Sequence, residues 1–394
     1  RSQIATGIPT KLLTMPDPIY LDHNATTPVA EEVFAAIAPW LREQHGNPSS
    51  SHPYGRRAAD AVATARAQVA ELIGAQSSEI VFTGCATEAN NLALLGVARA
   101  AGSTRRHLVI SSIEHPAVAA PAIALSELGW DVTVLTVDSF GRISEEALEQ
   151  ALRPDTALVS IMHANNEVGT LQPIAAIGEI TRARGILLHS DAAQSAGKLP
   201  LDVETLGVDL LTLAGHKFNA PKGIGALYVR AGTPIRPITY GADQEHGLRP
   251  GTESVALIVA LGAAASLARA SLPALSTQLQ TLRDRLHVQL QAGVPGLRLN
   301  GHADQRLPNT LHVSFPGISG RDLLAEASNA VAASVGSACH SDQDAVSGVL
   351  AAMGFDAERA RGAVRLSVGR TTQMDDIDKA AEALTAAWKL LTRQ

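Results

Sequence analysis

Short apolar runs alternate with helical patterns over a long part of the chain. The runs that predict buried strands cover residues 79–83, 107–111, 132–137, 157–162, 186–189, 210–213 and 224–229. Between most of them, apolar residues recur at the spacing of one helix face. Because strands that alternate with helices form parallel sheets with right-handed crossovers, the pattern predicts an α/β fold with a mainly parallel, doubly wound sheet.

Polar residues follow five of the predicted strands, at the point where each strand ends. They are Thr87, His115, Asn166, Asp191 with Gln194, and His216 with Lys217. In doubly wound sheets, ligands bind outside the carboxyl ends of the strands. Each residue alone could be an ordinary loop residue, but their shared position predicts that they line one pocket.

A different pattern begins after an apolar helix that we expect at residues 253–270. A second helix is expected at residues 275–292. Helices then mix with short strands at residues 297–299, 310–315, 331–335 and 364–368. This mixture predicts a smaller α+β domain after the parallel sheet.

A chain of 394 residues is too long for one ordinary core and suggests about two domains. We expect residues 31–268 to form the large domain. Residues 19–30 and 269–394 are expected to form the small one. Residues 1–18 are expected to be a leader that is either disordered or not part of the natural protein.

The helix predicted at the start of the large domain is amphipathic. Its apolar residues recur at helical spacing and are Val33, Phe34, Ile37, Trp40 and Leu41. We expect all of them to be buried against the rest of the domain.

The composition argues against several classes of partner. The net charge is −6, so no broad basic surface is expected for nucleic acid or an anionic membrane. The most apolar window, residues 255–268, is shorter than the roughly 18 residues of a membrane span and predicts a buried helix. With only Cys85 and Cys339, neither a disulfide framework nor a cysteine-rich metal site is expected, and a reducing cytoplasm fits best.

Lys217 lies shortly after the strand predicted at residues 210–213. Desolvation there would lower the pKa of its amine and make it a nucleophile that can form an imine with an aldehyde cofactor. The alternative is a loop lysine whose charged tip reaches solvent.

The other strand-end residues suit a cofactor with a pyridine ring and a phosphate. Asp191 could hold a protonated ring nitrogen, and His115 could stack on the ring face. Residues 84–87 open a helix whose N–H groups and dipole favour a phosphate. Together these features predict pyridoxal phosphate. A nucleotide is a weaker alternative, because the chain has no glycine-rich nucleotide motif after its first strand and no P-loop.

Cys339 lies in the small-residue segment SVGSACHSD at 334–342. An accessible thiol in a narrow, flexible segment suits a nucleophile. The alternative is a small, buried apolar residue, which is a common role for a single cysteine. Cys85, beside the predicted phosphate turn, is interpreted as structural.

These residues belong to an ordered series of motifs. The motifs are YLDHNATTP at 20–28, GNPSS at 46–50, ATEANN at 86–91, SSIEHPAV at 111–118, HANNEVG at 163–169, HSDAAQ at 189–194, GHKFNAPKGIGALYVR at 215–230, RPGTES at 249–254, SVGSACHS at 334–341 and RLSVGR at 365–370. Through them the chain resembles the cysteine desulfurases and selenocysteine lyases of the class V aminotransferase type. These are fold-type I enzymes that use pyridoxal phosphate.

The resemblance implies roles around the cofactor ring. Lys217 would form the Schiff base and later move the Cα proton. Asp191 would pair with the pyridine nitrogen, and Gln194 with the phenolic oxygen. His115 would stack on the ring and shuttle a proton.

The resemblance also implies how the phosphate would be held. Ala86, Thr87 and His216 would bind it within one chain. Thr252 would reach the phosphate of a partner subunit, so the protein is expected to be a homodimer.

For the substrate, the resemblance implies that Asn166 and Arg365 grip the carboxylate of L-cysteine, Arg365 in bidentate fashion. Cys339 would then attack the substrate sulfur, which gives L-alanine and a persulfide. The persulfide sulfur would pass to an acceptor or scaffold protein, as in iron–sulfur cluster assembly.

Three alternatives remain open at this point. The first is a lyase that converts L-selenocysteine to L-alanine and selenide. The second is another C–S lyase or epimerase with the same cofactor. The third is a non-catalytic scaffold for sulfur acceptors.

Overall fold

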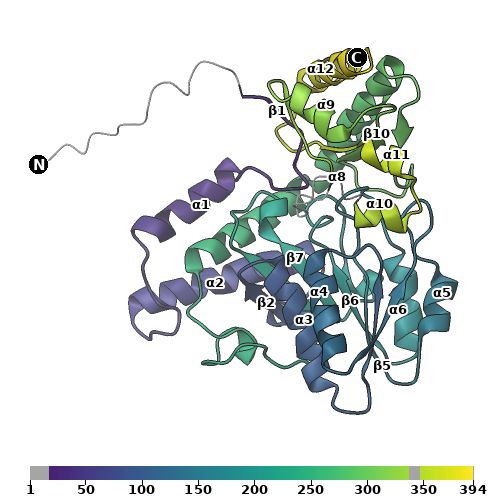
Figure 1. Ribbon diagram of the computed structural model, residues 1–394. Helices are drawn as coiled ribbons and strands as arrows, with labels where there is room; N and C mark the ends of the chain where they lie inside the picture. The colour runs from purple at the N-terminus through teal and green to yellow at the C-terminus, as the bar shows by residue number, and fades with distance from the viewer. Residues whose placement is uncertain (1–16, 337–346, 394) are drawn as a thin grey trace, which may run out of the picture.

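The computed structural model describes residues 17–336 and 347–393 (Figure 1). Its largest element is a seven-stranded sheet with the strand order β2-β8-β7-β6-β5-β3-β4. The strands are β2 (Ile80–Thr83), β3 (His107–Ser111), β4 (Asp131–Leu135), β5 (Thr156–Ser160), β6 (Leu187–Asp191), β7 (Leu210–Ala214) and β8 (Gly225–Val229). All neighbouring strands are parallel except β8, which runs antiparallel to both β2 and β7. The predicted α/β class with a mainly parallel sheet is confirmed.

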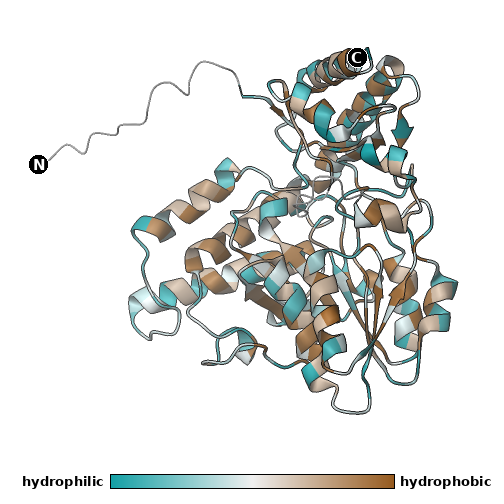
Figure 2. Ribbon diagram, viewed as in Figure 1, coloured by the Kyte–Doolittle hydropathy of each residue, from teal (hydrophilic) through white to brown (hydrophobic). Residues whose placement is uncertain are grey.

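Helices cover both faces of this sheet. On one face lie α2 (Pro53–Leu72), α5 (Glu145–Ala151), α6 (Ile174–Ala183) and the first half of α8 (Val255–Gly293). On the other lie α3 (Ala86–Ala100) and α4 (Pro116–Glu127). Successive strand residues point to opposite faces, so Leu211 packs on the first side and Leu210 on the second. Figure 2 shows the central strands as largely hydrophobic, as a sheet buried on both faces requires.

A second, smaller group of elements lies beyond the carboxyl ends of the parallel strands (Figure 1). Here β10 (Thr310–Ser314) pairs antiparallel with β9 (Arg298–Leu299) and β12 (Ala363–Ser367), and β1 (Ile19–Tyr20) pairs parallel with β11 (Val331–Ala332). The helices of this part are α9 (Gly320–Glu326), α10 (Gly348–Ala352), α11 (Ala357–Arg361) and α12 (Met374–Leu391).

Buried apolar residues form large clusters on the two faces of the seven-stranded sheet and a separate, smaller core in the second group of elements. The small one joins Leu21 to residues of α9, α12 and the second half of α8. The N-terminal strand β1 therefore belongs to a core that is otherwise formed by the C-terminal part of the chain. This arrangement supports the predicted division into domains, which stays a prediction.

At the junction of the two parts, α8 differs from the prediction made from the sequence. Two helices were expected, at residues 253–270 and 275–292, but one helix of 39 residues runs through Pro273. The proline removes one backbone donor without ending the helix, because apolar residues on both sides of it are anchored in a core. The predicted domain boundary at residue 268 therefore lies within α8. Among the described helices, α8 alone is long and apolar enough to cross a membrane. However, its first half packs in the core of the large sheet and its second half in the smaller core.

The helix α1 (Glu31–Arg42) is less buried than expected. Val33 and Ile37 face inward, but Phe34 is 59% exposed and Leu41 is 64% exposed. The helix packs on α8 and lies at the periphery of the molecule (Figure 1). It therefore buries one apolar stripe and leaves a second stripe in solvent.

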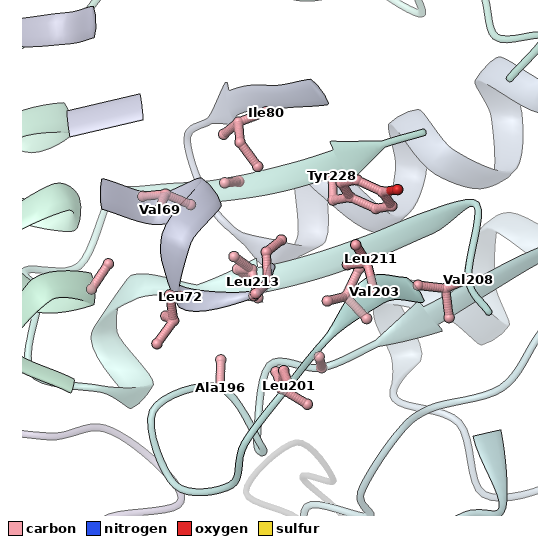
Figure 3. Packing of buried hydrophobic residues seen from close by; sticks show 14 of the residues in the cluster. Val69, Leu72, Ile80, Ala196, Leu201, Val203, Val208, Leu211, Leu213 and Tyr228 are labelled. Atoms are coloured by element: carbon pink, nitrogen blue, oxygen red, sulfur yellow. The ribbon is translucent and has the colours of Figure 1, made fainter. Parts of the chain in front are cut away.

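The short helix α7 (Val203–Leu206) closes the core beneath β6 and β7. Figure 3 shows its Val203 among the side chains of Leu201, Val208 and Leu211. Tyr228 of β8 lies in the same cluster and is opposite Leu211 in the strand register. Its hydroxyl is buried and finds no hydrogen-bond partner among the described residues.

We expect Tyr228→Phe to raise the free energy of unfolding by about 1 kcal/mol, because it removes a buried hydroxyl that has lost its water without gaining a partner. Urea denaturation of the two proteins measures the difference. Leu211→Ala is the matched control in the same cluster, and should instead lose about 2–5 kcal/mol. A loss of stability in Tyr228→Phe would show that the hydroxyl is satisfied.

Candidate active site

The predicted strand-end residues meet in one cavity of about 410 Å³. Those that line it are Ala86, Thr87, His115, Asn166, Asp191, Gln194, His216 and Lys217. Arg365 of β12 joins them from the smaller part of the molecule. The volume is that of a small-molecule site.

Two predicted residues are not placed in this cavity. Thr252 lies in a different hollow, which also includes Glu88, Arg249 and the turn of residues 239–244. Cys339 lies outside the described residues.

Lys217 ends the short 3₁₀ turn η3 (Gly215–Lys217) that follows β7. Its Nζ donates hydrogen bonds to the backbone carbonyls of Asn24 and Ala25, the latter at 2.9 Å. Burial, together with the positive charge of Arg365, lowers the pKa of the amine to about 8. A larger fraction of this amine than of an ordinary lysine is therefore deprotonated and nucleophilic near neutral pH.

Asp191 ends β6 and is held by two donors. Its Oδ2 accepts a hydrogen bond from Asn90 Nδ2 at 2.7 Å, and its Oδ1 accepts one from the backbone N–H of Ala193 at 2.9 Å. Donors that bind the charged form of a carboxylate favour that form. The sequence analysis gave Asn90 no role, yet its position three residues after Thr87 places both on one helix face.

His115 caps the N-terminus of α4. Its Nδ1 accepts a hydrogen bond from the backbone N–H of Ala117 at 3.1 Å, so the proton of the neutral ring lies on Nε2. Burial lowers the pKa of His115, while the nearby charge of Asp191 raises it. The net decrease favours a neutral ring, which can stack on an aromatic ligand.

The first turn of α3 is open to an anion. Its N-cap residue Cys85 makes no capping hydrogen bond through its side chain, and Ala86 and Thr87 line the cavity. The first N–H groups of a helix have no partner within the helix, and its dipole favours negative charge there. Ser112 also lines the cavity, and its buried Oγ has no partner among the described residues.

His216 stands beside Lys217 with its Nδ1 at 3.2 Å from Thr26 Oγ1. Burial, together with the charges of Lys217, Lys222 and Lys198, lowers the pKa of His216 to about 4. The ring is therefore neutral at pH 7. It can donate a hydrogen bond to an anion but adds no positive charge.

Arg365 is buried and already has two partners. Its Nη2 pairs with Asp22 Oδ1 at 2.8 Å, and its Nη1 donates to the backbone carbonyl of Asn166 at 2.9 Å. Its Nε has no partner within the described part of the chain. The backbone of Asn166 and the side chain of Asp22 thus orient the guanidinium toward the cavity.

The chain is also similar to known proteins in sequence and structure. The family model described as "Aminotransferase class-V" matches residues 19–380. The chain belongs to the class-V aminotransferase family.

Named relatives in this family cover nearly all of the chain. The chain is 42% identical to "Cysteine desulfurase IscS" of Dictyoglomus turgidum over 367 residues, which are 93% of either protein. A solved "NIFS-LIKE PROTEIN" has a TM-score of 0.89 and 37% identity, and the match covers 96% of this chain and 100% of that one. The structure titled "SspA in complex with cysteine" has a TM-score of 0.79 and 38% identity, with 89% and 98% covered.

Class-V aminotransferases of this kind depend on pyridoxal phosphate, and the cavity fits this cofactor. Its polar groups form the set that the cofactor needs: the Lys217 amine for the aldehyde, the Asp191 carboxylate for the ring nitrogen, and the open helix end at Ala86 and Thr87 for the phosphate. Ser112 lines the same cavity, and its unpartnered hydroxyl is a further group that can donate to a ligand. The individual roles of these residues remain proposals.

Three residues near the cavity were missed by the sequence analysis. The carbonyl of Asn24 accepts hydrogen bonds from both Lys217 and Gln194. Lys198 is buried behind Gln194, and burial lowers the pKa of its amine to about 7. Burial also raises the pKa of Glu114 to about 8. Asn24 and Glu114 lie inside the sequence motifs, whereas Lys198 had no signal except its place four residues after Gln194.

Both ends of the segment that carries Cys339 lie at this cavity. Gly336, Gly348 and Val349 line it. Ser347 Oγ donates a hydrogen bond to Glu167 Oε2 at 2.5 Å, and Glu167 also lines the cavity. Residues on both sides of the segment that carries Cys339 therefore lie at the cavity that Arg365 and Lys217 also line.

We expect the apo protein to react with a small uncharged aldehyde at Lys217 with a rate that rises with pH and levels off above about 8. The physical reason is that the lowered pKa makes the nucleophilic, deprotonated amine available above that pH, rather than above the ordinary 10.5. Reductive trapping and peptide mass spectrometry measure the rate. Labelling of exposed Lys389, followed over the same range of pH, is the control for the reagent. A midpoint for Lys217 near 10 would contradict the burial of its amine.

Proposed function

We propose that this protein is a cysteine desulfurase, which removes sulfur from L-cysteine, releases L-alanine and leaves a persulfide on Cys339. The observation that carries the proposal is the cavity itself. It brings a nucleophilic Lys217, a fixed Asp191 and a buried Arg365 together within a family whose named relatives are cysteine desulfurases. The complex of one structural relative with cysteine supports the same substrate.

Substrate binding is assigned to Arg365 and Asn166. A buried guanidinium binds a carboxylate strongly, because the charged hydrogen bonds form away from water. Arg365 is held in place by Asp22 and lines the cavity, where its guanidinium can meet the substrate carboxylate. Asn166 lines the cavity beside it.

Proton transfer is assigned to Lys217 and His115. When bound, pyridoxal phosphate supplies an electron sink that stabilises negative charge at the substrate Cα. The Nζ of Lys217, with a pKa of about 8, can accept the Cα proton and return it. The neutral His115 ring carries its proton on Nε2, since its Nδ1 accepts the helix-cap hydrogen bond, so Nε2 can donate this proton to the reacting groups and take it back.

Sulfur transfer is assigned to Cys339. The Cys339 thiolate attacks the substrate Sγ, a new S–S bond forms, and the Cβ–Sγ bond breaks. Its electron pair stays with the carbon fragment, which takes up protons to become alanine. Cysteine plus a thiol thus gives alanine plus a persulfide, and no external oxidant is needed. The position of both segment ends at the cavity supports this assignment.

The persulfide sulfur has to leave the protein for the next turnover. We propose a thiol or a scaffold protein as its acceptor, as in iron–sulfur cluster assembly. A reducing cytoplasm suits a protein with two cysteines and a reactive thiol.

A homodimer is also proposed. Phe34 and Leu41 lie seven residues apart on α1, and both are exposed, as is Tyr54 at the start of α2; exposed apolar residues on one helix face suit a protein contact. Thr252 lies outside the cavity of its own chain, as a residue that serves the cavity of a second copy would.

We expect Cys339→Ser to lower alanine formation from cysteine by about 1000-fold or more, because the attacking nucleophile is lost. After incubation of the wild-type protein with cysteine, mass spectrometry should find one added sulfur on the peptide that contains Cys339 and none on the peptide that contains Cys85. Undiminished turnover in Cys339→Ser would refute the desulfurase. The same assay with L-selenocysteine measures which of the two substrates is preferred.

We expect the double substitution Phe34→Glu with Leu41→Glu to convert the dimer to a monomer, because charge is costly in an apolar contact. Light scattering after size-exclusion chromatography measures the mass. Ile123→Glu, on the equally exposed side of α4, is the control and should leave the dimer intact. A wild-type protein that is monomeric at all concentrations would contradict the proposal.

A further inference from the structure

Lys198 is buried behind the wall of the cavity, and the reaction proposed above gives it no task. Its side chain is 5% exposed. Among the described residues, its amine has one hydrogen-bond partner, Oε1 of Gln194 at 3.2 Å. A buried amine with a single neutral partner lowers stability, since the charged form loses its water. Fold stability alone therefore does not explain a lysine at this position.

Gln194 has two ends of nearly the same shape and opposite character. Its Oε1 accepts hydrogen bonds and its Nε2 donates them, so neighbouring groups decide which way the amide points. The protonated amine of Lys198 has only donors, and it therefore selects Oε1. The carbonyl of Asn24 can only accept, and Nε2 of Gln194 donates to it at 3.0 Å. Both neighbours select the same orientation.

This orientation determines what Gln194 offers to the cavity that it lines. The Nε2 group has two protons, and Asn24 takes one of them. The other is free for a ligand and requires an acceptor, such as an anionic oxygen on an aromatic ring. In its protonated form, Lys198 behind the amide also places a positive charge that favours an anionic ligand atom. A flipped amide would present Oε1 and repel it.

We propose that Lys198 is a positioning residue that fixes the amide of Gln194 so that its N–H group faces the ring oxygen of the cofactor. This inference rests on the proposed function, because it assumes that pyridoxal phosphate occupies the cavity. Lys198 acts entirely through Gln194, and this separates it from a lysine that only helps the core to pack.

A double-mutant cycle with Lys198→Met and Gln194→Met tests the inference. Both substitutions keep side-chain length and remove the polar end. The dissociation constant of pyridoxal phosphate is measured for the four proteins by equilibrium dialysis, and the absorption maximum of the bound cofactor is recorded. Lys198→Met should weaken binding about tenfold and shift the absorption maximum, since a charge-assisted contact is lost and the amide can turn.

In the Gln194→Met background, the same Lys198→Met change should alter binding by less than about twofold, because two residues that act as a unit are not additive. Equal effects in the two backgrounds, or no effect in either, would overturn the inference. Lys389→Met, on the exposed surface of α12, is the control for the loss of one positive charge and should bind the cofactor like the wild type.

Thermal unfolding and cofactor binding by the wild-type protein show whether the inference fails alone or together with the proposed function. Thermal unfolding of apo Lys198→Met should show a stable protein, because an apolar side chain replaces a buried amine. If the wild-type protein binds no pyridoxal phosphate, the proposed function and the inference both fail. If it binds the cofactor and the cycle is additive, only the role of Lys198 fails.

Discussion

The residue on which the site depends most is Asn24, which is completely buried between the two cores. Its carbonyl accepts hydrogen bonds from Lys217 and Gln194 on the large side. Its side chain and backbone N–H bind Thr310 and Ser367 on the small side. This one residue thus helps to position the reactive amine and links the two parts that form the cavity.

The sheet and its polar edge could be predicted because both follow from local pattern. Apolar runs indicate strands, and parallel strands bring their carboxyl ends together, so Asp191 and Lys217 could be assigned to one pocket from the sequence alone. Phe34 was predicted to be buried but is exposed. Periodicity identifies the apolar stripes of a helix, but it does not show which stripe packs against another element. The contacts of Asn24 and Lys198 depend on segments distant in sequence. The place of Cys339 stays a prediction because it lies outside the described residues.

Three basic side chains lie in or just behind the wall of the cavity. Lys198, Lys217 and Arg365 lie close enough that each lowers the pKa of at least one of its neighbours. Asp22 and Asp191 offset part of this charge from opposite sides. A cofactor phosphate and a substrate carboxylate would bring further negative charge to the basic side chains of the cavity.

The helix α8 has a mechanical consequence. It is a single rod whose two halves are embedded in different cores, so the two parts of the molecule cannot swing apart as bodies on a loose linker. Pro273 leaves the carbonyl one turn before it without its helical donor, and a helix bends most easily at such a place. The stiffness of one helical turn would then set how far Arg365 can move from Lys217, and with it how wide the entrance opens to a substrate.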